Sequence, residues 1–156
     1  MKRVTTALAL AGAMACAANA SAQMLEKKTL SLAEAMKVSA AAQDEAKKNN
    51  WVMSIAVFDD GGNLIVLHRM DEAFIGSVQV AQDKGRSALQ FKRPTKVFED
   101  GVAGGRHALL GLTGAMPIEG GVPIMSGGKI VGAIGVSGGA APQDGQVAKA
   151  GADTVK

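Results

Sequence analysis

The stretch WVMSIAVFDDGGNLIVLHRM, residues 51–70, contains two apolar runs separated by a strong turn signal. Residues 51–58 and 64–70 are rich in apolar, often β-branched side chains, and the Asp-Asp-Gly-Gly-Asn sequence between them is typical of a tight turn. The pattern predicts a β-hairpin. Because adjacent positions of the first run are apolar, both faces of that strand need a cover, either helices or another subunit.

A second hairpin is predicted near the C-terminus. Residues 122–125 and 129–136 read as strands, and Gly127-Gly128 between them forms a two-residue loop. Gly132 and Gly135 fall inside the second of these strands, where glycine weakens a sheet unless something must approach its backbone closely. Two explanations stay open at this point: a closely packed helix, or a slot for a flat ligand.

Helical patterns surround the two hairpins. Ser31 and Glu34 form a capping box, and apolar residues then recur at helical spacing over residues 32–48. Further helices are predicted over residues 77–91 and 95–102, and a terminal helix is expected to open at Asp144. The order helix, hairpin, helices, hairpin, helix predicts an α/β protein, with a central antiparallel sheet in an α/β/α layer arrangement.

Composition limits the classes of function. The chain has 156 residues, of which 47% are hydrophobic and 20% charged, which indicates one compact domain. Lys and Arg outnumber Asp and Glu by 17 to 14, but Lys2 and Arg3 lie in a segment that we expect to be removed. The remaining balance is close to neutral, and the chain has no Tyr and one Trp. Both features argue against nucleic acid as a partner.

The N-terminus has the layout of an export signal. Residues 1–22 combine a basic start, an apolar stretch and the small-residue triplet Ala-Ser-Ala, which is typical of a secretory signal peptide cleaved before Gln23. A transmembrane anchor is the alternative, but the apolar run is short and Gly12 interrupts it. We therefore expect a periplasmic or secreted protein without stable membrane insertion, and a single domain over residues 23–156.

Cysteine chemistry is not expected in the exported chain. Cys16 is the only cysteine, and it lies inside the predicted signal. Its removal would leave no disulfide, no thiolate metal ligand and no thiol nucleophile.

Glycine motifs do not support a nucleotide site. Gly132, Gly135 and Gly138 have dinucleotide-like spacing, but they lie in and after a late hairpin strand, whereas the fingerprint requires a first strand that turns into a helix. Lys129 follows two glycines, but Ile130 occupies the position where a P-loop requires Ser or Thr. No nucleophile elbow is present, and we assign no catalytic residue.

The two histidines are candidate ligands of a haem iron. His68 lies near the end of a predicted strand and His107 lies in a glycine-rich loop, and their separation excludes a local metal motif. Each can simply be a partly exposed polar residue. In the functional interpretation a loop histidine supplies an axial bond to iron, and His107 is the preferred metal ligand.

Other polar side chains are candidates for contacts to a cofactor. Arg69 lies in a charged cluster with Asp71 and Glu72, which is either a solvated strand end or an ion pair at a pocket rim. One predicted helix places a cation, a hydroxyl and an aromatic ring at positions i, i+3 and i+7, namely Lys84, Ser87 and Phe91. Such a face would suit the propionates and plane of a porphyrin, although ordinary helix surface is the alternative.

Seven short motifs, taken in order, resemble the GlcG/HbpS family of small haem-associated proteins. The similarity runs from about residue 30 to 151, nearly the whole mature chain. The motifs are LSLAEA (30–35), VFDDGG (57–62), RMD (69–71), DKGRSA (83–88), RPT (93–95), PIEGGVP (117–123) and VGAIGVSG (131–138).

The resemblance implies a profilin-like α/β/α sandwich that assembles into a homo-oligomer. It also implies a link to haem or iron, because members include exported haem binders that slowly degrade haem. The family commonly has Thr at the position of Ser87, which is implicated in contact with iron or haem, and Ala at the position of Gly85. Ser keeps the hydroxyl without the methyl group that restricts its rotamer.

Three functions are therefore expected as alternatives. The first is an exported haem-binding protein with His107 or His68 on the iron. The second is a protein that binds or converts a small organic acid such as glycolate, with Arg69 or Lys84 on the carboxylate. The third is an oligomeric module that regulates a partner protein.

Overall fold

A computed structural model describes residues 24 and 26–156, so the predicted signal peptide over residues 1–22 lies outside the described residues. The described chain forms four α-helices, one short 3₁₀ helix and four strands. In chain order they are α1 (Leu32–Lys48), β1 (Ser54–Asp59), β2 (Leu64–Arg69), α2 (Ile75–Gln90), α3 (Lys96–Ala103), η1 (His107–Gly111), β3 (Gly121–Ser126), β4 (Lys129–Ser137) and α4 (Ala141–Ala152).

The four strands form one antiparallel sheet in the order β2-β1-β4-β3. Both predicted hairpins are present, and they join through the central pair β1 and β4, in which Ala56 lies opposite Gly135. The first five residues of β1 are buried on both faces of the strand. The sheet is therefore covered on both sides, as the apolar run of β1 predicts.

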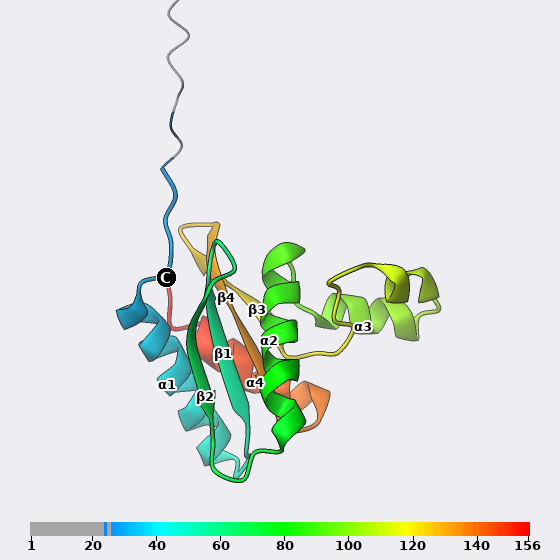
Figure 1. The fold of residues 1–156 in the computed structure, drawn as a ribbon, viewed down its shortest axis with the longest axis horizontal. Coiled ribbons are helices and arrows are strands. Elements are labelled where there is room, and N and C mark those ends of the chain that lie inside the picture. The colour runs from blue at the N-terminus through cyan, green and yellow to red at the C-terminus, as the bar shows by residue number, and fades with distance from the viewer. Residues whose placement is uncertain (1–23, 25) are drawn as a thin grey trace, which may run out of the picture.

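Helices form the two outer layers (Figure 1). α1 and α4 pack against one face of the sheet and against each other, while α2 lies across the other face over β4, β1 and β3. The expected α/β/α sandwich with a central antiparallel sheet is thus the observed architecture.

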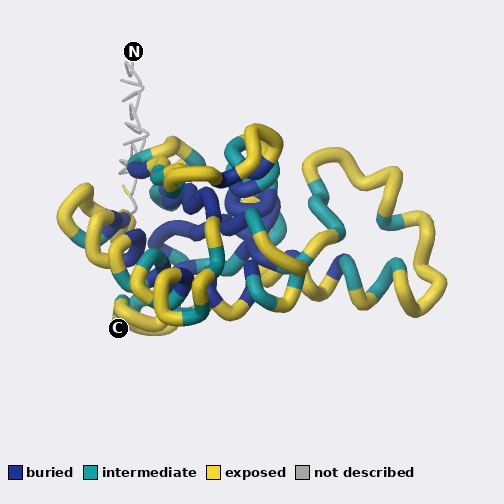
Figure 2. Tube along the Cα trace, turned by 90° about the horizontal axis from the view of Figure 1, so that it is seen from below, coloured by how far each residue is buried: buried dark blue, intermediate teal, exposed yellow. Residues whose placement is uncertain are grey.

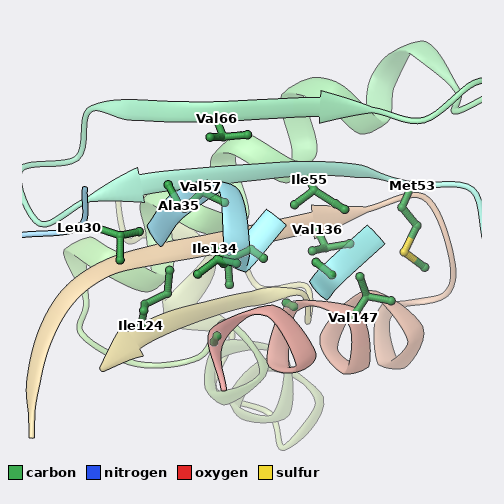
Figure 3. Packing of buried hydrophobic residues seen from close by; sticks show 14 of the residues in the cluster. Leu30, Ala35, Met53, Ile55, Val57, Val66, Ile124, Ile134, Val136 and Val147 are labelled. Carbon is green, nitrogen blue, oxygen red and sulfur yellow. The ribbon is translucent and has the colours of Figure 1, made fainter. Parts of the chain in front are cut away.

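The main apolar core fills the space between the sheet and the pair α1 and α4. Ile55, Ile134 and Val136 of the central strands are fully buried there, together with Val147 of α4 (Figure 3). The opposite face has a smaller cluster of Ala56, Phe58 and Ala81. Small residues dominate that face, so α2 lies close to the strands.

The helix starts follow local hydrogen bonds. Ser31 caps α1, and its Oγ accepts from the backbone N–H of Glu34 at 3.2 Å, which confirms the predicted cap. The terminal helix begins at Ala141 and not at Asp144. The Gln143 side chain accepts from the backbone N–H of Ala140 at 2.9 Å, which leaves the Asp144 carboxylate to other partners.

The turn between β1 and β2 is held by Asp59. Its Oδ1 accepts from the backbone N–H of Gly61 at 2.9 Å and from that of Asn63 at 2.8 Å, and Gly62 adopts a positive φ of 85°. Partial burial acts to raise the pKa of Asp59, but hydrogen bonds from the Asn63 side chain and from the backbone N–H groups of the turn outweigh it and lower that pKa. The turn sequence fixes the hairpin as predicted.

One segment projects away from the sandwich, and we name residues 96–115 the arm (Figures 1 and 2). It contains α3 and η1, and the latter forms within a stretch that the glycines predict as plain loop. Phe98 is the only buried residue of these two helices. At the base of the arm the Thr95 N–H donates to the Gly121 carbonyl, and the Gly121 N–H donates to the Thr95 hydroxyl, both at 3.0 Å.

Candidate functional site

Lys84, expected on a ligand-binding helix face, is buried in an ion pair. Its side chain is 1% exposed, and Nζ lies 2.7 Å from Oδ2 of Asp144. Burial raises the pKa of Asp144, against the opposing effects of the Lys84 ammonium and of the Gly139 N–H, which donates to Oδ1 at 2.9 Å. The ammonium is therefore used inside the protein, where it joins α2 to α4.

Ser87 and Phe91 hold the arm. Ser87 is fully buried, and its Oγ accepts from the backbone N–H of Met116 at 2.9 Å. Phe91 is partly buried and packs edge to face on Phe98 of α3, with ring centroids 5.1 Å apart. The face formed by Lys84, Ser87 and Phe91 is thus neither open helix surface nor an exposed porphyrin contact, because α2 turns it toward the sheet and the arm.

Arg69 orders the turn that follows β2. Its Nε donates to the carbonyl of Ala73 at 2.9 Å, and its Nη2 contacts the same oxygen. Within the described chain Arg69 forms no ion pair with Asp71 or Glu72, so the solvated strand end is the better of the two explanations given above.

His68 joins β2 to α1. Its side chain is partly buried, and Nδ1 lies 2.7 Å from the hydroxyl of Ser39 and also contacts the side-chain amide of Gln43. One nitrogen of this imidazole is therefore occupied by partners from α1. The proximity of Ser39 and Gln43 arises only in the fold, because they lie 29 and 25 residues from His68 in the sequence.

His107 has a different environment, at the start of η1 on the arm. The residue is exposed, and its backbone N–H donates to the carbonyl of Gly105 at 2.9 Å. Across residues 24 and 26–156, none of the side-chain hydrogen bonds or ion pairs uses its ring. The structure therefore separates the two histidines, and it leaves the imidazole of His107 accessible.

At Gly135 the close approach comes from a helix, which excludes a slot for a flat ligand there, whereas at Gly132 it comes from the Phe58 carbonyl of the neighbouring strand β1. A methyl group at Gly135 would lie 1.9 Å from the carbonyl oxygen of Ala81 and 2.4 Å from the nitrogen of Gly85. The backbone of α2 therefore touches the backbone of β4, and no space remains there for another molecule.

A large groove lies elsewhere, at the end of the sandwich where both hairpins turn. We name it the basic groove; it has a volume of about 960 Å³. It is bounded by the segment before α1, the two hairpin turns and the C-terminal end of α2. Five cationic and two acidic side chains line it with apolar and glycine residues, namely Glu26, Lys27, Lys28, Asp60, Gly61, Gly62, Arg86, Leu89, Gln90, Lys92, Met125, Gly128, Lys129 and Ile130.

A second pocket, of about 500 Å³, lies between β3 and α4. Its two lysines are paired with acidic neighbours one helical turn away, Lys96 with Asp100 and Lys149 with Asp153. It therefore offers a ligand less unpaired charge than the basic groove. Over residues 24 and 26–156, no three His, Cys, Asp or Glu side chains are grouped to hold a metal ion.

Comparison with known proteins gives a consistent family. Residues 30–153 match the family described as haem degrading protein HbpS-like. Protein GlcG of Escherichia coli K12 is 46% identical over 114 residues, which covers 73% of this chain and 85% of that protein. The chain belongs to the HbpS-like family.

Solved structures of other proteins share the fold. A double mutant of Streptomyces reticuli HbpS superposes with a TM-score of 0.77 at 28% identity, and the match covers 99% of both chains. A PduOC–haem complex superposes with a TM-score of 0.73 at 24% identity, over 82% of this chain and 96% of that one. The resemblance to the GlcG/HbpS family predicted from the motifs is confirmed, together with the layered fold.

Sequence reasoning missed two features of this HbpS-like chain. The sequence predicts that Asp144 opens the terminal helix, whereas the structure pairs it with Lys84, 60 positions away in the chain. A signal for this pairing was present, because Lys84 lies within the stripe of small residues Ala81, Gly85 and Ala88 that α2 buries. The basic groove gave no local signal, since its cations come from three separate segments, namely the chain before α1, the C-terminal end of α2 and the second hairpin turn.

Proposed function

We propose that the protein is an exported haem-binding protein, acting as a homo-oligomer outside the cytoplasm. The observation that carries this proposal is membership of a family described by haem degradation, over residues 30–153. The signal-like layout of residues 1–22 supports export. Within the described residues no helix is long and apolar enough to cross a bilayer.

The side chains of this chain fit haem in two places. The imidazole of His107 is exposed on the arm and is available to an iron ion, whereas Nδ1 of His68 is engaged by α1. The basic groove offers ammonium groups and apolar side chains, which match the propionates and the ring of a porphyrin. Haem would supply a redox-active iron, and the chain's own residues would bind and orient it.

The two residues predicted to bind an organic acid, Arg69 and Lys84, are both engaged by other groups of the protein. Arg69 donates to the Ala73 carbonyl, and the Lys84 ammonium is buried against Asp144. The Lys84 ammonium is therefore not accessible to a carboxylate from solution, and two of the three guanidinium nitrogens of Arg69 are directed to the Ala73 carbonyl. We therefore retain haem as the ligand, and keep oligomer formation as a property of the same protein.

A hemin titration tests the proposal. Chain recovered from the periplasm, which we expect to begin at Gln23, should give a saturable Soret shift with hemin. His107→Ala should change the position of the Soret and visible bands, because an axial ligand is lost. His68→Ala is the matched control and should leave the bands unchanged. A spectrum no different from that of hemin with an inert protein would exclude haem binding.

A further inference from the structure

Several cations of the basic groove lack partners. Across the described residues, Lys28, Lys92 and Lys129 have no carboxylate within 4.0 Å, while Lys27 pairs with Asp60 at 3.4 Å. Because five cations and only two carboxylates line the groove, the net field there is positive. The groove is therefore suited to an anion that carries more than one negative charge.

Arg86 adds a cation that the fold holds in place. Its guanidinium carbon lies 5.1 Å from the centre of the buried Phe58 ring, and Nη2 donates to Oε1 of Gln82 at 3.3 Å. An arginine stacked on an aromatic ring loses less conformational entropy when it binds an anion than a free side chain does. Arg86 therefore offers a preorganised contact at one side of the groove.

The rest of the groove is apolar and wide. Leu89 of α2 and Ile130 of β4 are half-buried, and Met125 of β3 is 42% exposed. Gly62 in the first hairpin turn has no side chain, and its Cβ position would be 3.7 Å from Leu89 Cδ2. A volume of about 960 Å³ lies near the upper end of the range for drug-sized ligands, so an acid of two or three carbons would leave most of it to water.

From these observations we propose that the basic groove binds the propionate edge of a tetrapyrrole, with Lys92 and Lys129 on the carboxylates and Leu89 and Ile130 against the ring. This inference rests on the proposed haem-binding function and assigns the site within it. No histidine lines the groove, so this site recognises carboxylates and an apolar plane rather than iron. His107 lies on the arm and not in the lining of the groove, so an axial bond from it would be a separate contact.

Separate titrations with hemin and with iron-free protoporphyrin IX test the inference on the full mature chain. Both ligands should bind, and raising the NaCl concentration from about 0.05 to 0.5 M should lower the affinity of the chain for each of them. The double variant Lys92→Gln/Lys129→Gln should bind both ligands with an affinity about tenfold lower, because two exposed charge contacts are lost. The matched control, Lys47→Gln/Lys48→Gln, removes two exposed lysines from the end of α1 and should have no effect.

The outcomes separate this site from the function on which it rests. His107→Ala should alter the hemin spectrum and leave protoporphyrin affinity unchanged. Hemin binding without protoporphyrin binding, or equal affinities in the Lys92/Lys129 and Lys47/Lys48 variants, would overturn the groove assignment and leave haem binding intact. Failure of both ligands to bind would remove the proposed function as well.

Discussion

At the scale of single residues, Gly135 sets the distance between a helix and the sheet. The nearest atoms to its missing side chain belong to the backbone of α2, at Ala81 and Gly85, and a methyl group at Gly85 would in turn lie 2.7 Å from Cε2 of Phe58. The sequence predicted close approach at Gly135 but left the approaching partner open. A periodic pattern records which strand positions lack side chains, whereas the identity of the neighbour depends on tertiary packing.

Gly135→Ala should destabilise the protein by about 3 kcal/mol or more, because the contact is with backbone that cannot rotate away. Urea unfolding followed by circular dichroism, at matched protein concentration, measures this loss. Gly111→Ala is the control, since nothing lies within 4 Å of its Cβ position, and it should change stability by no more than about 0.5 kcal/mol. Equal stabilities for the two variants would contradict the close contact between the backbones of α2 and β4.

At the scale of elements, the Lys84–Asp144 pair joins helices that cover opposite faces of the sheet. The two side chains meet next to Gly120, whose Cβ position would lie 2.9 Å from both Lys84 Nζ and Asp144 Cβ. A side chain at residue 120 would therefore collide with the pair. Sequence periodicity placed α1, α2 and both hairpins correctly, but it carries no information on which residues of separate helices meet across a sheet.

Lys84→Met should lower the free energy of unfolding by about 3–5 kcal/mol, since it leaves a buried carboxylate without its counter-charge. Lys84→Met/Asp144→Asn should recover part of that loss, because no unpaired charge remains. Chemical unfolding of Lys84→Met, Asp144→Asn, the double variant and the wild type gives the coupling energy between the two side chains. A double variant less stable than Lys84→Met would contradict the pairing.

The same variant should be sensitive to pH. In Lys84→Met the folded-state pKa of Asp144 should rise further above the unfolded value of about 4. Stability contributed by a group with a raised pKa is present below the unfolded pKa and is lost as the pH rises through the folded one. The stability gap between Lys84→Met and the wild type should therefore be wider at pH 8 than at pH 4.5.

At the scale of the whole molecule, the sandwich is well covered and the arm is not. Figure 2 shows the arm as a mostly exposed projection beside a buried sheet. Val97, Leu110 and Leu112 of the arm are 49%, 62% and 41% exposed, and Ile118 at its base is 42% exposed. The glycines at 101, 104 and 105 predicted a loop there. Those glycines could not show that the segment would project with its leucines outward, because exposure depends on what the rest of the chain leaves uncovered.

Exposed leucines on a projecting segment favour burial against another copy of the chain. Leu110→Asp/Leu112→Asp should therefore reduce the mass measured by light scattering to that of a single chain, while far-UV circular dichroism stays unchanged. Leu32→Asp is the control: this residue is 61% exposed at the first position of α1, where an acidic residue favours the helix, and it should leave the oligomer intact. If the arm also brings His107 to a neighbouring groove, the single chain should lose the axial-ligand bands with hemin and still bind protoporphyrin. A wild-type mass for the arm variant would show that the arm is not the interface between copies.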